Sequence, residues 1–327
     1  MTRYNARLHR RAFAQLAATG AATIAFPRFT RAADDAKMKT HTYKKVGDVE
    51  IKADVYNAPA GGRRPTVIWI HGGALIVGHR GGLMNRFHDN LIGAGWTVVS
   101  IDYRLAPETK LPAILEDVRD ACRWVREQGP NLFGADPERI AVTGGSAGGY
   151  LTLCSGFLVE PRPKALVPFW GYGDVAGSWY SRPDPFYSKQ PAVPKEEAYA
   201  AVGNEVITGG EGKNNRGRFY LYCRQQGLWP REVTGHDPDE EPKAFDPFCP
   251  VRNVTANYPP TMLIHGDQDT DVPYEQSVLM DKQLTRHGVE HELVTVAGGG
   301  HGLSGIDAKI VDATYDRAIE FLRRHLR

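Results

Sequence analysis

Cysteine is scarce in this sequence, long apolar runs are absent, and charge of neither sign dominates. Only four cysteines occur among 327 residues, and no pair has the C-x-x-C spacing typical of zinc ribbons and dithiol redox motifs. No apolar run reaches the roughly 18–20 residues that a membrane-spanning helix needs. The sequence therefore excludes those motif classes and predicts no membrane span. Cys122 lies on an apolar helical stripe, which indicates core packing, whereas a Cys223–Cys249 bridge stays open.

The formal net charge of +2 originates in the first 32 residues, which carry six arginines. Without those arginines, 34 basic residues face 38 acidic ones, a net charge of −4. The remaining sequence therefore gives no indication of a nucleic-acid partner, which would favour a basic patch or stripe.

Residues 1–32 have the pattern of an export signal. Basic residues lead into "RRAFAQLAATGAATIAF", an apolar stretch of small residues, and "FTRAADDA" follows. The pair Arg10-Arg11 with Phe13 resembles a twin-arginine signal, although His9 stands where Ser or Thr is usual. We expect cleavage after Ala32 and a periplasmic or extracellular location. The alternative is a short amphipathic helix of the mature protein.

Short apolar runs alternate with helical patterns along the chain. Most of these runs are apolar throughout, which is typical of parallel strands buried on both faces. They cover residues 66–70, 96–101, 140–143, 165–169, 261–266 and 291–296. Apolar residues recur at steps of three and four in 114–125 and 310–322, which predicts helices there. With a strand pair turning near Gly47-Asp48, the order predicts an α/β domain over 40–327, with a mostly parallel sheet flanked by helices.

A long polar segment interrupts this rhythm at about residues 172–258. It is too long for a plain loop of a compact domain, so we predict an inserted cap between the sixth and seventh core strands. Helices are expected in 196–207 and 217–228. Six aromatic residues lie in or beside the cap. Each of them either lines a pocket or packs in the cap's own core, and the core is the expected role for each. They are Trp170, Tyr172, Trp179, Tyr180, Tyr220 and Trp229.

The glycine cluster "RIAVTGGSAGGY" follows the apolar run 140–143. Its spacing fits neither the dinucleotide fingerprint G-x-G-x-x-G nor a P-loop, which would need lysine where Tyr150 stands. It fits G-x-S-x-G, in which Ser146 would be a nucleophile on a sharp strand-to-helix turn. A helix N-cap serine is the alternative role. The N–H of Ala147, together with Gly72 and Gly73 after another strand, would form an oxyanion hole.

A serine nucleophile needs a base and a group that orients the base. Three acidic residues, Asp267, Asp269 and Asp271, follow the run 261–266. A calcium loop is excluded there because Val272 and Val278 occupy the positions that need Gly and Glu. The base candidate is His301, in a glycine-rich loop after the last strand, whereas His265 precedes the acids and is expected to be structural. The order Ser, acid, His is that of α/β-hydrolases.

With these motifs, the sequence resembles the hormone-sensitive-lipase-like group of bacterial esterases in the α/β-hydrolase superfamily. The matching segments are HGGA (71–74), DYRLAPE (102–108), GGSAGG (144–149), HGDQD (265–269) and GGGHG (298–302). The resemblance selects Asp269 as the acid, beside Ser146 and His301. It departs from the family's H-G-G-G at Ala74, and the cap comes from the insertion rather than from the N-terminus.

The resemblance implies a serine esterase that acts on a small-molecule ester and needs neither a metal nor a cofactor. Short-chain, carbohydrate or phenolic esters are the expected substrates. Two alternatives stay open. A prolyl-oligopeptidase-like peptidase or amidase would use the same three residues, and a non-catalytic binding module would use none.

Overall fold

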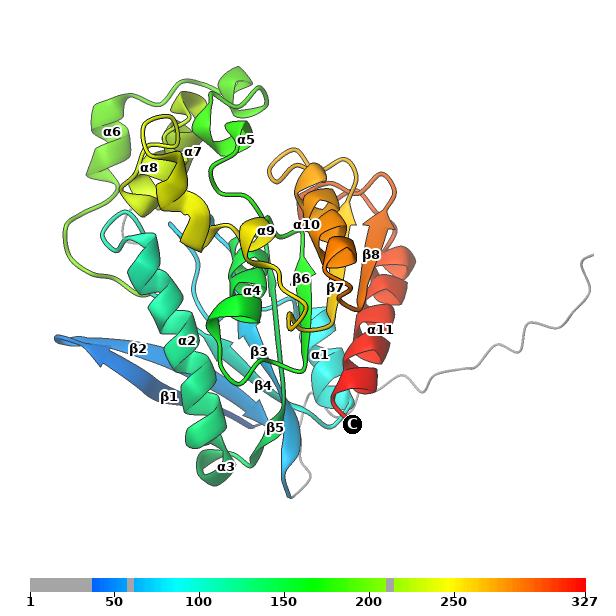
Figure 1. The fold of residues 1–327 in the computed structure, drawn as a ribbon. Coiled ribbons are helices and arrows are strands. Elements are labelled where there is room, and N and C mark those ends of the chain that lie inside the picture. The colour runs from blue at the N-terminus through cyan, green and yellow to red at the C-terminus, as the bar shows by residue number, and fades with distance from the viewer. Residues whose placement is uncertain (1–36, 58–61, 210–214) are drawn as a thin grey trace, which may run out of the picture.

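The computed structural model of the protein describes residues 37–57, 62–209 and 215–327 (Figure 1). The expected export signal at residues 1–32 lies outside the described residues. None of the helices in the described ranges combines the length and hydrophobicity required to cross a bilayer.

An eight-stranded sheet with the order β1-β2-β4-β3-β5-β6-β7-β8 forms the centre of the fold. β1 and β2 are the predicted antiparallel pair, and β2 also runs antiparallel to β4. All neighbours from β4 to β8 are parallel, so their carboxyl ends lie at one edge. The strands are β1 Lys37–Val46, β2 Val49–Asn57, β3 Arg64–Ile70, β4 Thr97–Ile101, β5 Ala135–Gly145, β6 Ala165–Phe169, β7 Thr261–Gly266 and β8 His291–Val296.

Helices cover both faces of the sheet (Figure 1). One apolar cluster joins one face to α1 and α11, and a second joins the other face to α2, α4 and α10. β4 and β6 are buried along their whole length, as expected for strands covered on both sides. These helices are α1 Asn85–Gly93, α2 Leu111–Glu127, α4 Ala147–Leu158, α10 Glu275–Arg286 and α11 Ala308–His325, and the short α3 Gly129–Leu132 follows α2.

The segment between β6 and β7 folds into short helices at one end of the molecule, drawn in green and yellow in Figure 1. It contains α5 Ser178–Ser181, η1 Tyr187–Lys189, α6 Lys195–Ala200, α7 Arg216–Gln226, α8 Trp229–Thr234, η2 Pro242–Phe248 and α9 Pro250–Asn253. The predicted α/β fold, with an insertion between the sixth and seventh strands, is confirmed. We refer to residues 172–258 as the insertion.

Two element boundaries differ from the sequence expectations, and one open question is answered. α6 ends at Ala200 rather than near 207, because Gly203 and Asn204 are weak helix formers. β5 begins at Ala135 rather than Ile140, and its first half is polar where it pairs only with β3. All four cysteines are buried and free, so no Cys223–Cys249 bridge is present.

Candidate active site

Ser146 lies at the turn between β5 and α4, at the carboxyl edge of the sheet. Its backbone has φ 58° and ψ −122°, a conformation that non-glycine residues rarely adopt and that costs of order 1–3 kcal/mol. Small neighbours make this turn sterically possible. A Cβ on Gly148 would lie 2.0 Å from the Ile70 carbonyl oxygen, so only glycine lets α4 approach β3 this closely.

The loop after β3 places Gly72 and Gly73 beside that turn. Gly73 has φ +109°, and its carbonyl accepts the N–H groups of Ile76 and Val77 at 2.9 Å each. Ala74 stands where the resembled family has a third glycine, and it adopts the left-handed region with φ 55°. Among the described residues, no acceptor is recorded for the N–H groups of Gly72 and Gly73, nor for that of Ala147. These three donors are therefore available to a ligand.

The insertion holds this loop in place through two side chains. Arg216 in α7 donates from Nε to the Ile76 carbonyl at 2.8 Å and pairs with Glu108 at 2.7 Å. Trp229 in α8 donates from Nε1 to the Ala74 carbonyl at 2.9 Å and is fully buried. The conformation of the loop thus depends on helices that are more than 130 residues away in the sequence.

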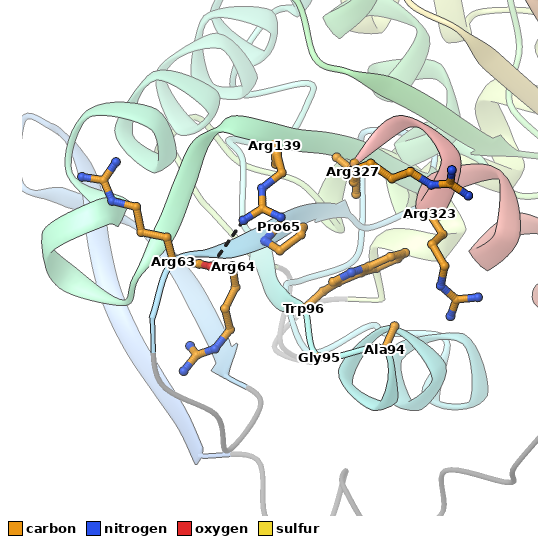
Figure 2. A pocket seen from close by; sticks show the side chains of 10 residues that line it. Arg63, Arg64, Pro65, Ala94, Gly95, Trp96, Arg139, Arg323 and Arg327 are labelled. Atoms are coloured by element: carbon orange, nitrogen blue, oxygen red, sulfur yellow. Dashed lines mark hydrogen bonds between the residues drawn. The ribbon is translucent and has the colours of Figure 1, made fainter.

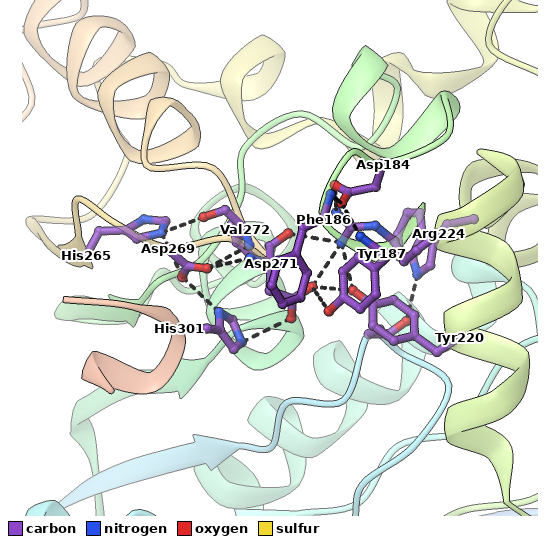
Figure 3. Close-up of polar contacts among 12 residues, drawn as sticks. Asp184, Phe186, Tyr187, Tyr220, Arg224, His265, Asp269, Asp271, Val272 and His301 are labelled. Carbon is purple, nitrogen blue, oxygen red and sulfur yellow. Dashed lines mark hydrogen bonds and ion pairs between the residues drawn. The ribbon is translucent and has the colours of Figure 1, made fainter. Parts of the chain in front are cut away.

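Asp269 and His301 come together from the loops after β7 and β8 (Figure 3). His301 Nδ1 lies 2.8 Å from Asp269 Oδ2, a hydrogen bond in which the ring N–H donates to the carboxylate. Asp269 Oδ1 accepts the N–H groups of Asp271 and Val272 at 2.8 and 2.9 Å. The Asp269 side chain is completely buried. The structure thus brings together the acid and the base selected from the sequence.

Burial and hydrogen bonding act in opposite directions on this pair. Burial alone would raise the pKa of Asp269, but hydrogen bonds from His265 and His301 hold it well below the usual range. Burial alone would lower the pKa of His301, but the hydrogen bond to Asp269 and the charges of Asp271 and Asp269 raise it. The pair therefore carries an ionised acid beside a histidine of increased basicity.

Two residues near the pair were not identified as functional from the sequence. His265 was expected to be structural, and its Nε2 lies 3.3 Å from Asp269 Oδ2 and 3.0 Å from the Val272 carbonyl. Both neighbours are acceptors, so Nε2 carries the proton and Nδ1 accepts from Ser277 at 2.7 Å. Asp271 Oδ2 lies 3.4 Å from His301 Nε2. The two-residue spacing of Asp269 and Asp271 was the only available signal for the second carboxylate.

Ser146 and His301 line the same cavity, which has a volume of about 360 Å³. Its other walls are mainly apolar. The lining residues are Trp69, Gly72, Gly73, Ala74, Val77, Gly82, Met84, Gly145, Trp170, Tyr220 and Asp271. Ser146 Oγ and His301 form no hydrogen bond in the described part of the chain.

The six aromatic residues in or beside the cap divide between the cavity and the core. Of these six, only Trp170 and Tyr220 reach the cavity, and Tyr180 stacks on Trp229 at 4.0 Å in the core.

A second cavity of about 440 Å³ lies near the amino ends of β3 and β5 (Figure 2). Five arginines and Trp96 contribute to its walls, and Arg139 donates to the Arg63 carbonyl at 3.4 Å. It contains none of the residues selected from the sequence. In open α/β sheets ligands bind at the carboxyl ends of the strands, so the smaller cavity is the candidate active site.

A family described as "alpha/beta hydrolase fold" matches residues 67–304 of the chain. This range includes Ser146, Asp269 and His301 and most of the sheet. The chain belongs to the α/β-hydrolase fold family. The superfamily indicated by the motifs is therefore confirmed. In the described ranges of this α/β hydrolase, no group of three or more His, Cys, Asp or Glu side chains is arranged to hold a metal ion.

Individual relatives of this α/β hydrolase include both esterases and much larger proteins. It is 29% identical to "Non-reducing polyketide synthase adrD" of Penicillium rubens over 88% of this chain and 14% of that protein. It is 29% identical to "Esterase LipC" of Mycobacterium tuberculosis over 85% of this chain and 61% of that protein. The chain thus spans only part of these curated relatives. A solved esterase of Pyrobaculum calidifontis superposes with a TM-score of 0.64 at 25% identity, over 89% of this chain and 87% of that one.

Proposed function

We propose that this α/β hydrolase is a serine esterase that cleaves carboxylic esters through an acyl-enzyme on Ser146. One observation carries the proposal. Ser146, on a strained turn, and His301, hydrogen-bonded to the buried Asp269, line one cavity. A nucleophile, a base and an orienting acid in this order are the parts that acyl transfer requires.

In the proposed reaction, His301 Nε2 takes the proton from Ser146 Oγ as that oxygen attacks the ester carbonyl. Asp269 keeps the ring oriented and stabilises its charged form. The negative charge on the former carbonyl oxygen is held by the N–H groups of Gly72, Gly73 and Ala147. The protonated His301 then gives its proton to the leaving alcohol. Water, deprotonated by His301, releases the acid and regenerates Ser146.

The names of two relatives, both esterases, support ester cleavage over amide cleavage. A cavity of about 360 Å³ suits a small ligand, so we propose short-chain, carbohydrate or phenolic esters as substrates. The signal pattern of residues 1–32 supports export, with a hydrolase domain over 40–327 and a cap at about 172–258. The substrate class and the export of the protein are thus both proposals that go beyond the fold.

Hydrolysis of p-nitrophenyl acetate tests the proposal. We expect Ser146→Ala to lower kcat by about 10⁶ if the three residues act as a unit. Ser178→Ala, an exposed serine of α5, is the matched control and should retain full activity. A fluorophosphonate should label the wild type at Ser146 alone. Near-normal hydrolysis by Ser146→Ala would refute the mechanism, and faster cleavage of an X-Pro amide than of esters would favour a peptidase.

A further inference from the structure

Two carboxylates contact His301, one at each ring nitrogen (Figure 3). Asp269 at Nδ1 fulfils the orienting role on its own. Asp271 Oδ2 lies 3.4 Å from Nε2, the atom that exchanges protons with the nucleophile and the leaving group. Ring orientation therefore does not account for the position of Asp271.

The insertion fixes Asp271 through its other carboxylate oxygen. Oδ1 accepts from the Tyr220 hydroxyl at 2.6 Å, the Tyr187 hydroxyl at 2.9 Å and Arg224 Nη1 at 2.9 Å. Arg224 Nη1 also donates to the Asp271 main-chain carbonyl at 3.0 Å. Three donors occupy Oδ1. Oδ2 is therefore the carboxylate oxygen that can accept a hydrogen bond from a ligand in the cavity, which Asp271 lines.

A neutral His301 leaves Oδ2 without a donor. Nδ1–H donates to Asp269, so Nε2 of the neutral ring is an acceptor. Two acceptors, Nε2 and Asp271 Oδ2, then face each other at 3.4 Å. A hydroxyl supplied by the substrate would bind beside them and donate its proton to Oδ2, which removes this mismatch.

The charges around the cavity also disfavour anions. Among the described residues that line it there is one carboxylate, Asp271, and no lysine or arginine. Arg224 contacts Asp271, but it also pairs with Asp184, whose Oδ2 lies 2.5 Å from Nη2. The group of one arginine and two aspartates therefore keeps a net negative charge.

The position of Oδ2 identifies the portion of the ester that it faces. In acyl transfer, Nε2 gives its proton to the leaving alcohol oxygen, whereas the oxyanion donors face the carbonyl oxygen. A group beside Nε2 therefore faces the alcohol portion. Building on the function proposed above, we propose that Asp271 is a specificity-determining residue that accepts a hydrogen bond from a hydroxyl group near the ester oxygen. The substrate class is monoesters of polyols, including sugars and glycerol, and esters with a carboxylate on the alcohol portion are rejected.

Three acetate esters that differ only in the alcohol portion test the proposal. They are 2-hydroxyethyl acetate, propyl acetate, which has the same shape but lacks the hydroxyl, and acetoxyacetate, which carries a carboxylate. For the wild type we expect kcat/KM for the hydroxyethyl ester to exceed that for the propyl ester by about tenfold or more, the range of a hydrogen bond to a charged group. We expect acetoxyacetate to be the poorest substrate.

Asp271→Asn should bring the ratio of hydroxyethyl to propyl ester close to one and increase the turnover of acetoxyacetate. Asp246→Asn removes the same charge from an exposed site of the insertion that does not line the cavity, so it should leave both ratios unchanged. The wild-type ratios alone decide the proposal if Asp271→Asn does not fold. Equal hydrolysis of all three esters by the wild type would overturn the role of Asp271 and leave the esterase intact. Absence of turnover with every ester, p-nitrophenyl acetate included, would overturn both.

Discussion

Replacement of Arg224 by methionine should destabilise the protein by about 3–5 kcal/mol, the cost of breaking a buried ion pair from one side. The guanidinium is 1% exposed and pairs with Asp184 at 2.5 Å and Asp271 at 2.9 Å. Methionine fills part of the same volume but leaves two carboxylates, 10% and 19% exposed, without their cation. The four aromatic rings around Arg224 cannot replace that charge.

Urea unfolding followed by circular dichroism measures this loss. With a slope of about 3 kcal/mol per M, the expected midpoint falls by about 1–1.7 M. Arg218→Met is the matched control on the same helix, since Arg218 forms an exposed pair with Glu197 and should leave the midpoint unchanged. Adding Asp184→Asn to Arg224→Met should restore part of the stability. Equal midpoints for the two arginine variants would refute the assignment of Arg224 as the buried cation that joins the insertion to the β7 loop.

Three further outcomes follow from the site. The pKa of His301 is raised above its ordinary 6.5 by Asp269 and Asp271 against the effect of burial. The proposed mechanism requires a neutral His301, so kcat/KM should fall with decreasing pH through a midpoint above 6.5, and a pH profile measures this. Asp269→Asn should lower kcat by about 10⁴ in the p-nitrophenyl acetate assay, because the amide favours the wrong ring tautomer. Gly148→Ala places a Cβ 2.0 Å from a backbone oxygen and should lower the melting temperature, whereas Gly217→Ala, exposed with its nearest contact at 3.5 Å, should not.

The core elements were predictable because their signal is local. Buried parallel strands are apolar throughout, and β6 matches the predicted run 165–169 residue for residue. The strained turn at Ser146 was predictable because its strain and crowding require small residues at fixed spacing. β5 was underestimated because its first residues pair on one side only and stay polar.

The second carboxylate was not predictable because its partners come from a segment without a periodic apolar signal. Tyr220 and Arg224 are four residues apart and share a face of α7, but the sequence does not show that this face meets the loop after β7. Tyr187 reaches the same carboxylate from a 3₁₀ turn. Contacts between an irregular insertion and the loop after β7 depend on the tertiary fold, so sequence spacing alone could only mark Asp271 as one of three candidate acids.

The insertion contacts two separate parts of the candidate active site, the loop after β3 and Asp271 in the loop after β7. Arg216 and Trp229 hold the loop that carries the proposed oxyanion donors, whereas Tyr187, Tyr220 and Arg224 hold Asp271 beside His301. Arg216 and Trp229 act, through that loop, on the groups proposed to bind the carbonyl oxygen, which every ester has. Tyr187, Tyr220 and Arg224 act, through Asp271, on the alcohol portion, which differs between esters. Changes in these three residues should therefore alter the choice of substrate more than the rate of acyl transfer, whereas changes in Arg216 and Trp229 should reduce the rate for all esters alike.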